Sequence, residues 1–184
     1  AIDHGTGSNR WAIALTGYQG GTHNTPDTFT VGADSFTAQG TNYNDGSDNW
    51  RVFLKELTVT GNQTPVLHFT GTYGGGGAAH CAYLILQGTG ALTIANVLAM
   101  LGQFTGGAGG DLFRGISGSS GNTLYLLGHT SDTGATAYSG TLVTSSATGK
   151  VIVTDTSAGS SNDVGITVGA FGTLYSTGFS VSEA

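Results

Sequence analysis

Hydrophobic and polar residues alternate along most of this chain, and this period of two limits its fold more than any other feature. In residues 11–18, for example, Trp11, Ile13 and Leu15 fall on one face of an extended strand. Successive side chains of a β-strand point to opposite faces, so alternation indicates a strand with one buried face. Similar short runs predict strands over residues 50–60, 65–73, 78–87, 123–128, 138–144, 151–155, 164–171 and 173–181. The chain is therefore expected to be all-β.

Two of these runs depart from simple alternation. In one of them the apolar face changes between Leu54 and Leu57, which predicts a bulge or a bend near residues 55–56. Residues 78–87 are almost continuously apolar, which favours a central strand that is covered on both faces. The single cysteine, Cys81, lies in this run, and we expect it to be a small buried core residue.

Turn-forming residues separate the runs at intervals that are typical of β-sandwiches, about 8–12 residues. A chain of 184 residues also falls within the range of a single all-β domain. We therefore predict one antiparallel β-sandwich over residues 1–184. The glycine-rich stretch 105–110 is interpreted as a flexible connection, and a domain boundary there is the alternative. The two halves show no repeat beyond their shared strand pattern.

Residues 91–101 follow a different pattern. Apolar side chains spaced at i, i+3, i+4 and i+7 line one face of an α-helix. The residues at this spacing are Ile94, Val97, Leu98 and Leu101. The segment predicts a short helix, with a buried strand as the competing interpretation.

Charge is scarce in this sequence. Charged residues make up 9% of the chain, against about 25% in an ordinary soluble domain. The formal net charge is −6, so the chain lacks the basic patch that nucleic-acid binding needs. An acidic chain is also repelled by anionic membranes, and no run of about 18 apolar residues is present. We expect neither nucleic acid nor membrane among its partners.

The residues that could support catalysis are few. Glu56 and Glu183 are the only glutamates, whereas a glycosidase needs two carboxylates that face one cleft. Pairing Glu56 with Asp34 or Asp111 has no support from their spacing. The Gly-x-Ser-x-Gly motif of a serine nucleophile is also absent. We predict no catalytic residue and a protein that is not an enzyme.

The segment 42–49 is rich in asparagine and aspartate. Hard oxygen ligands within one turn suit Ca²⁺, although the spacing does not match an EF-hand. The candidate calcium ligands are Asn42, Asn44, Asp45 and Asp48. Asparagine and aspartate also gather in turns because they bond to the local backbone. We therefore expect no cofactor, and calcium at this segment is the alternative.

Aromatic residues gather near the predicted strand ends. Exposed aromatic rings there could stack on the C–H groups of a sugar. The candidate ligand-binding residues are Tyr18, Tyr43, Tyr73 and Trp50. Two other interpretations stay open, namely subunit contact and ordinary packing at strand ends with the hydroxyl groups in water.

Three segments carry a resemblance to a known group of proteins. Residues 7–10, Gly-Ser-Asn-Arg, lead into an alternating strand. Residues 51–57 then run on to a glycine-rich hairpin near residues 69–71, and the apolar strand 82–88 ends in glycine. In this respect the chain resembles jelly-roll-type β-sandwich modules of bacteriophage virion proteins and secreted bacterial proteins. The resemblance implies a structural or adhesive setting and no catalytic residues.

Two hypotheses about function follow. The first is a non-enzymatic structural protein of a bacteriophage virion, such as a capsid decoration, head-fibre or tail component. Its expected partners are copies of itself, as a trimer by analogy, and other virion proteins such as the major capsid protein. The alternative is a secreted carbohydrate-binding or adhesin module, with calcium as its optional cofactor.

Overall fold

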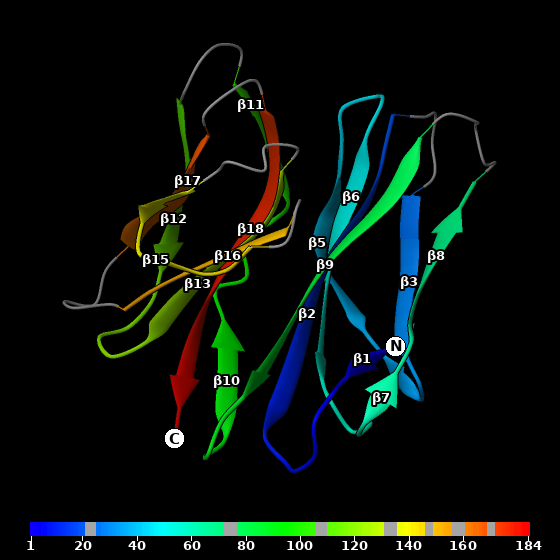
Figure 1. Ribbon diagram of the computed structural model, residues 1–184, viewed down its shortest axis with the longest axis vertical. Helices are drawn as coiled ribbons and strands as arrows, with labels where there is room; N and C mark the ends of the chain where they lie inside the picture. The colour runs from blue at the N-terminus through cyan, green and yellow to red at the C-terminus, as the bar shows by residue number, and fades with distance from the viewer. Residues whose placement is uncertain are drawn as a thin grey trace. The chain divides into compact units, whose positions relative to one another are not determined.

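The computed structural model describes residues 1–20, 25–71, 77–105, 110–130, 136–145, 149–155, 161–168 and 172–184. Every regular element in these ranges is a β-strand, as Figure 1 shows. The prediction of an all-β antiparallel sandwich is confirmed, and the jelly-roll topology stays an expectation. Within the same ranges, no helix is long and apolar enough to cross a membrane.

The contacts within the chain group it into two compact units, Ala1–Leu92 (unit 1) and Thr93–Ala184 (unit 2). Each unit has its own sheets and its own hydrophobic core. The division does not fall in residues 105–110, where the sequence offered a boundary. The flexible connection expected there lies largely outside the described residues, and the single domain over residues 1–184 stays a prediction.

Unit 1 is built from a larger and a smaller antiparallel sheet. The strands are β1 Ile2–Asp3, β2 Arg10–Gln19, β3 Thr25–Val31, β4 Asp34–Ser35, β5 Thr37–Asn44, β6 Asn49–Glu56, β7 Asn62–Gln63, β8 Pro65–Thr70 and β9 Ala78–Gln87. The larger sheet has the order β5-β6-β2-β9 and the smaller sheet has the order β4-β3-β8. Strands β1 and β7 form a separate short pair.

The core of unit 1 is rich in phenylalanine. Its buried members are Ala12, Ala14, Phe29, Val31, Phe36, Phe53 and Leu57. The rings of Phe29 and Phe36 meet edge to face, with their centroids 4.9 Å apart. Phe29 stacks on Phe53 at a centroid distance of 6.0 Å. The alanines of β2 are small, and large rings beside small residues fill the space between sheets at close to crystal density.

The structure corrects several expectations about unit 1. No register shift interrupts β6 up to its end at Glu56, so the bulge expected near residues 55–56 is wrong, and the bend that was its alternative stays a prediction. The Leu57 N–H donates to the carbonyl of Arg10 at 2.8 Å, which holds its side chain in the core. Strand β9 lies at the edge of its sheet because β2 takes the central place, and Cys81 is exposed.

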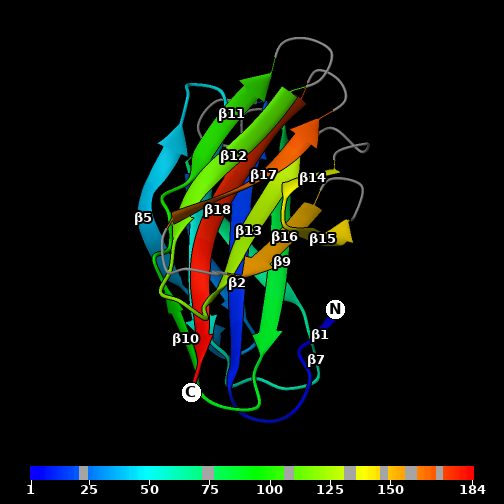
Figure 2. The ribbon, with the colours of Figure 1, turned by 90° about the vertical axis from the view of Figure 1, so that its left-hand side faces the viewer.

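Unit 2 also contains two sheets. The strands are β10 Leu92–Ala95, β11 Leu101–Thr105, β12 Gly110–Ser117, β13 Thr123–Thr130, β14 Thr136–Ser139, β15 Thr141–Ser145, β16 Gly149–Asp155, β17 Ser161–Val168 and β18 Gly172–Glu183. One sheet has the order β10-β18-β13-β16-β15, and β11 also pairs with β18 (Figure 2). The other sheet has the order β12-β17-β14. The buried core between them is aliphatic: Ile116, Leu124, Leu126, Ile152, Val164, Ile166 and Leu174.

The predicted helix over residues 91–101 is wrong. The segment forms β10, a connection and the start of β11. Asn96 has a positive φ of 53°, which a right-handed helix does not allow. The Leu98 N–H donates to the carbonyl of Gly178 (2.8 Å), and the Thr177 hydroxyl donates to the carbonyl of Leu98 (2.8 Å). Bonds to the distant strand β18 therefore replace the local bonds of a helix.

The two units repeat one pattern of strand pairing. In unit 1, β2 pairs with β6 and β9, β5 pairs with β6, and β3 pairs with β8. In unit 2, β13 pairs with β16 and β18, β15 pairs with β16, and β14 pairs with β17. The strands correspond in chain order, and every pairing is antiparallel. The two halves of the sequence share no repeat beyond the alternation, so the likeness lies in topology.

Candidate functional site

The expected asparagine- and aspartate-rich loop is a tight hairpin turn. Asn42 and Asn44 belong to β5 and Asn49 belongs to β6, so residues 45–48 alone form the turn. The Asp45 N–H donates to the carbonyl of Asp48 at 3.3 Å. Half of the segment 42–49 that the sequence assigned to a loop is therefore strand.

The polar side chains of this turn bind its own backbone. Asp45 Oδ1 accepts hydrogen bonds from the N–H groups of Ser47 (3.0 Å) and Asp48 (2.8 Å). Asn44 Oδ1 accepts the N–H of Gly46 at 2.7 Å. Side chains that bond to the backbone a few residues ahead are the usual reason for aspartate and asparagine in turns.

Two further contacts tie the turn to its surroundings. Asp48 is buried, and its Oδ1 accepts the N–H of Gly20 at the end of β2 (2.8 Å). The Tyr43 hydroxyl donates to Asp45 Oδ2 at 3.4 Å. Burial, together with the charge and hydrogen bond of Asp45, raises the pKa of Tyr43. The turn is thus fixed by side chains at both of its ends.

The calcium prediction concerns these same oxygens. The structure brings Asn44, Asp45 and Asp48 together in one turn, where each has an oxygen that accepts a backbone N–H. Asn42 Oδ1 is buried and has no hydrogen-bond partner. In the part of the chain that the structure describes, no three histidine, cysteine, aspartate or glutamate side chains are grouped to hold a metal ion. Calcium at Asn42, Asn44, Asp45 and Asp48 stays a prediction.

The candidate sugar-stacking residues are largely withdrawn from the surface. Trp50 is 0% exposed and Tyr18 is 1% exposed, so neither presents a ring face to a ligand. Tyr43 is partly exposed and Tyr73 lies outside the described residues. Packing therefore covers the rings of Trp50 and Tyr18, and ligand binding at Tyr18, Tyr43, Tyr73 and Trp50 stays a prediction.

A glycine in the neighbouring strand makes room for the buried ring of Trp50. Gly17 of β2 lies in register between Trp50 of β6 and His80 of β9. A Cβ atom on Gly17 would overlap the Trp50 ring, so the absence of a side chain makes room for the indole. The Trp50 and His80 rings stack at 5.9 Å. Burial lowers the pKa of His80, although Asp48 opposes the shift.

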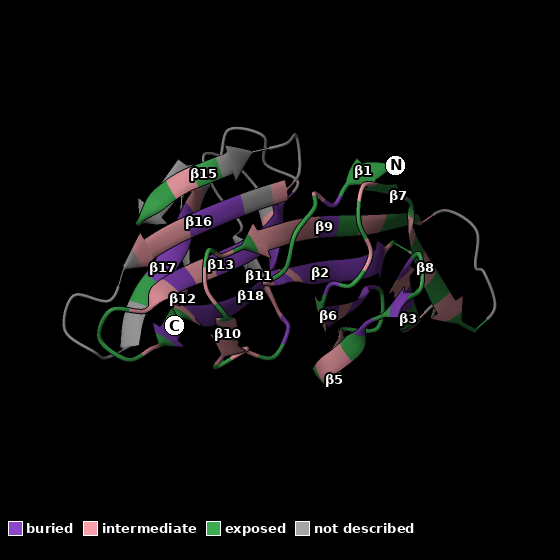
Figure 3. Ribbon diagram, turned by 90° about the horizontal axis from the view of Figure 1, so that it is seen from below, coloured by how far each residue is buried: buried purple, intermediate pink, exposed green. Residues whose placement is uncertain are grey.

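Strand β9 presents a long regular edge. It pairs with β2 without interruption from Arg10 opposite Gln87 to Gln19 opposite Ala78. Its 10 residues contain no lysine, arginine, aspartate, glutamate or proline. Ala78, Ala79 and Cys81 are exposed, and Figure 3 shows β9 in the colours of exposed and intermediate residues beside the largely buried β2. Among the described strands, β2 is the only partner of β9.

Four other edge strands, β5, β8, β14 and β15, carry features that discourage pairing, whereas β11 and β12 pair with their neighbours without a shift; β11 is only five residues long and β12 carries Asp111 and Arg114. The pairing registers of β5, β14 and β15 with their neighbours are each interrupted by a shift. Strand β8 begins with Pro65, which has no N–H to donate. Bulges and prolines of this kind are common ways to protect an edge from further strands. Strand β9 has neither feature, so it stands apart from these edges.

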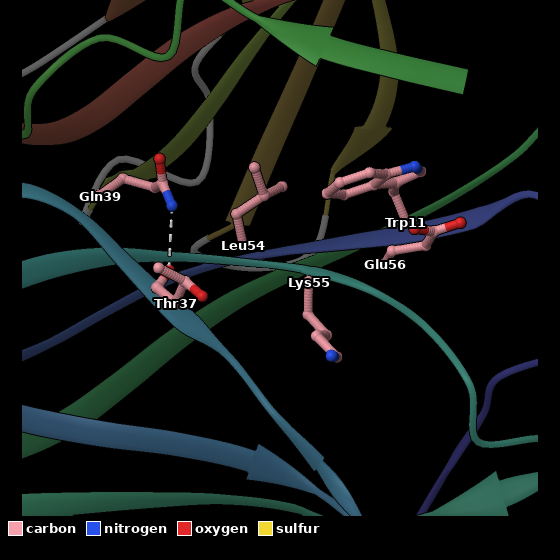
Figure 4. Close-up of a pocket in the computed structure, with 6 residues that line it drawn as sticks. All are labelled: Trp11, Thr37, Gln39, Leu54, Lys55 and Glu56. Carbon is pink, nitrogen blue, oxygen red and sulfur yellow. Dashed lines mark hydrogen bonds between the residues drawn. The ribbon is translucent and has the colours of Figure 1, made fainter. Parts of the chain in front are cut away.

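Unit 1 also has a pocket that the sequence analysis did not single out. Its volume is about 370 Å³. It is lined by Trp11, Thr37, Gln39, Leu54, Lys55 and Glu56 (Figure 4). The register pairs Trp11 with Glu56 and Thr37 with Leu54. These pairings bring together residues from three strands. The sequence pattern predicted the strand that contains Trp11 but not its neighbours in the pocket.

Comparisons with known proteins do not indicate a family or a function for this site. Neither the protein-family models, nor the curated proteins, nor the solved structures contain a match to this chain. The function is therefore argued from the edge of β9 and from the pocket at Trp11.

Proposed function

We propose that this chain is a non-enzymatic structural protein of a bacteriophage virion, which acts by assembling with copies of itself and with other virion proteins. The observation that carries the assembly role is the uncharged, uninterrupted edge of β9. The virion setting is supported by the resemblance at residues 7–10, 51–57 and 82–88 and by the low charge of the chain.

The edge of β9 has the properties of a pairing surface. Every second residue of an edge strand directs its backbone N–H and C=O away from the sheet, where another strand can bond to them. Burying charged side chains carries a desolvation penalty, and β9 has none to bury. We propose that the β9 strand of a second copy pairs with it in antiparallel orientation.

Cys81 offers a direct test of this pairing. Opposite residues of antiparallel strands have Cα atoms about 4.5–5.5 Å apart, within the range that a disulfide spans. Cys81 lies in the exposed part of β9. Burial raises the pKa of the Cys81 thiol to about 12, so a strong thiol oxidant is needed rather than mild oxidation. In the two-fold register that places the two Cys81 residues opposite each other, this oxidant is expected to link two chains, as seen on a non-reducing gel. The Cys81→Ser variant should lose the link and keep its assembled mass by light scattering.

A charged substitution separates edge pairing from other modes of assembly. Ala79→Lys places a charge on the exposed part of β9 and is expected to reduce the assembled mass to that of one chain. Thr6→Lys, at an exposed position before β2, is the matched control and should leave the mass unchanged. A wild-type protein of one-chain mass at all concentrations would contradict the proposal.

The expected trimer requires a different kind of contact surface from a pair of β9 strands. Two β9 strands that pair with each other form a two-fold contact, whereas a ring of three needs two different patches on each copy. Light scattering distinguishes the two masses. A trimer that survives Ala79→Lys would contradict assembly through β9.

The virion setting has its own test. Mass spectrometry of phage particles purified from the source culture should detect peptides of this chain at a fixed ratio to the major capsid protein. Their absence from intact particles would contradict the virion role and leave the edge-pairing experiment unaffected.

A further inference from the structure

The pocket at Trp11 combines an aromatic wall with polar groups from two neighbouring strands. Trp11 comes from β2, Gln39 from β5 and Glu56 from β6. In Figure 4 the side chains of Trp11, Leu54 and Gln39 extend to the same side of the strands, whereas Lys55 extends to the opposite side. Trp11 is partly exposed, unlike the fully buried Trp50.

The polar groups of the pocket are available to a ligand. The Gln39 Nε2 group donates to the carbonyl of Thr37 (3.1 Å), which orients the amide and leaves its oxygen as an acceptor. Glu56 is exposed and makes no hydrogen bond or ion pair with a described residue. The indole N–H of Trp11 likewise has no partner among the described groups. The pocket therefore offers two acceptors and one donor beside an apolar ring.

We infer that the pocket formed by Trp11, Gln39, Leu54 and Glu56 binds a neutral sugar. A pyranose ring has an apolar C–H face that stacks on an indole and hydroxyl groups at its rim that donate to amide and carboxylate oxygens. Small-molecule sites generally combine an apolar lining with a few polar groups that fix orientation. This inference goes beyond the assembly role, because it uses another surface of unit 1.

A cationic ligand is the alternative to a neutral sugar at this pocket, because an aromatic ring beside a carboxylate can also hold an ammonium group. The side chain of Lys55 extends to the opposite side of the strands in Figure 4, so its charge does not decide between the two. The Gln39 amide oxygen and the Trp11 indole N–H are uncharged groups that suit the hydroxyl groups of a sugar, which both donate and accept. These two groups favour the neutral ligand.

Two tryptophans give a spectroscopic test. The ¹H–¹⁵N spectrum of the full chain should contain two indole N–H signals, from Trp11 and Trp50. Glucose, galactose, mannose and N-acetylglucosamine are titrated separately. At least one sugar is expected to shift the Trp11 signal saturably, with a dissociation constant on the order of millimolar, and to leave the Trp50 signal in place.

Variants assign the binding to this pocket. Trp11→Ala should abolish the shifts that the sugar causes in the Gln39 side-chain amide signals of the same spectrum, and the Trp50 signal reports whether the variant is folded. Glu56→Gln keeps the shape of the side chain and should weaken binding about tenfold, since its hydrogen bond to the sugar no longer involves a charged acceptor. Asp27→Asn, an exposed carboxylate on β3, is the control for charge alone and should leave the affinity unchanged.

Three results would overturn the inference. The first is a folded protein whose Trp11 signal responds to none of the sugars. The second is an affinity that Glu56→Gln leaves unaltered. The third is a Trp11 signal that responds to tetramethylammonium chloride and to no sugar, which would assign the pocket to cationic ligands.

Discussion

Units 1 and 2 share a strand order but fill it with different side chains. The core of unit 1 contains Phe29, Phe36 and Phe53, with Tyr83 packed against them. The core cluster between the sheets of unit 2 contains isoleucine, leucine and valine, whereas the buried Tyr175 and Phe179 lie outside this cluster. The corresponding central strands differ accordingly, with alanines on the core face of β2 and leucines on that of β13. The same topology is thus compatible with two ways of filling the space between sheets.

This difference teaches which property of a core the fold depends on. Small residues on one sheet accept rings from the other in unit 1, whereas branched residues of similar size meet in unit 2. Cores tolerate such exchanges when total volume and the alternation of apolar residues are kept. The alternation is therefore what the two units have in common.

The units also differ in how they use buried polar groups. In each of them an arginine binds backbone carbonyls: Arg10 donates to His4 and Val59, and Arg114 donates to Ser176 and Ala99. Unit 1 additionally buries the carboxylate of Asp34. Because the pKa of Asp34 is held below its usual value, we expect this group to make the stability of unit 1 depend on acid.

The largest expected effect compares the two cores directly. Phe29→Ala should lower the free energy of unfolding by about 3–5 kcal/mol, because it leaves a ring-sized cavity and removes three aromatic contacts. Leu126→Ala in unit 2 should lower it by about 2–3 kcal/mol. Urea denaturation followed by circular dichroism measures both. Equal losses would contradict the distinction between an aromatic and an aliphatic core.

The next effect tests the buried carboxylate of unit 1. Asp34 accepts hydrogen bonds from the N–H and hydroxyl groups of Thr58 (2.7 and 2.6 Å) and from the N–H of Val59 (3.0 Å). Burial acts to raise the pKa of Asp34, but these bonds and the charge of Lys55 hold it below its usual 3.8. Asp34→Asn should lower the free energy of unfolding by about 1–3 kcal/mol at neutral pH.

The same carboxylate predicts a pH dependence. A depressed pKa means that the unfolded chain binds the proton first, so the stabilisation is present above pH 3.8 and is lost as the pH falls below that value. The Asp34→Asn variant should lack this acid-sensitive part. Asp27→Asn is the exposed control, and its free energy of unfolding should vary with pH as that of the wild type does. If Asp34→Asn and Asp27→Asn showed the same pH dependence, the role of Asp34 would be refuted.

A smaller effect is expected at Asn96 of unit 2. Its Nδ2 group donates to the carbonyl of Ser117 (3.0 Å) and to Ser180 Oγ (3.2 Å). Asn96→Gly keeps the positive φ accessible and removes both bonds, so the free energy of unfolding should fall by about 1 kcal/mol. Denaturation at several pH values measures the loss, which should not vary with acid. A loss as large as that of Asp34→Asn would contradict the ranking.

The smallest effect concerns His80. Its pKa is lowered by burial against the opposing charge of Asp48, so its neutral form is favoured in the folded protein. The free energy of unfolding that the neutral His80 contributes is therefore present above pH 6.5, and it declines as the pH falls below that value. His80→Gln should flatten the stability curve in that range, and His68→Gln on the exposed side of β8 should not. If the free energy of unfolding changed with pH equally in the wild type and in His80→Gln, the assignment of this pH dependence to His80 would be ruled out.

The sequence by itself determined the all-β class, the scarcity of charge and most strand positions in residues 123–181. These properties are local, because alternation and turn residues act within a few positions of each other. The sequence also placed Asn44, Asp45 and Asp48 at one turn, since they are neighbours along the chain.

Only the tertiary structure decided which strands became neighbours. Alternation does not reveal whether β9 lies at the centre or the edge of its sheet, because both positions can carry apolar residues. It also cannot pair Trp11 with Glu56, which are joined by the register of β2 and β6. Residues 91–101 did not form a helix because Gly178 and Thr177 of the distant strand β18 bind Leu98 in the connection between β10 and β11, and a short isolated helix is only marginally stable. The edge and the pocket that carry the proposals here both arise from such long-range pairing.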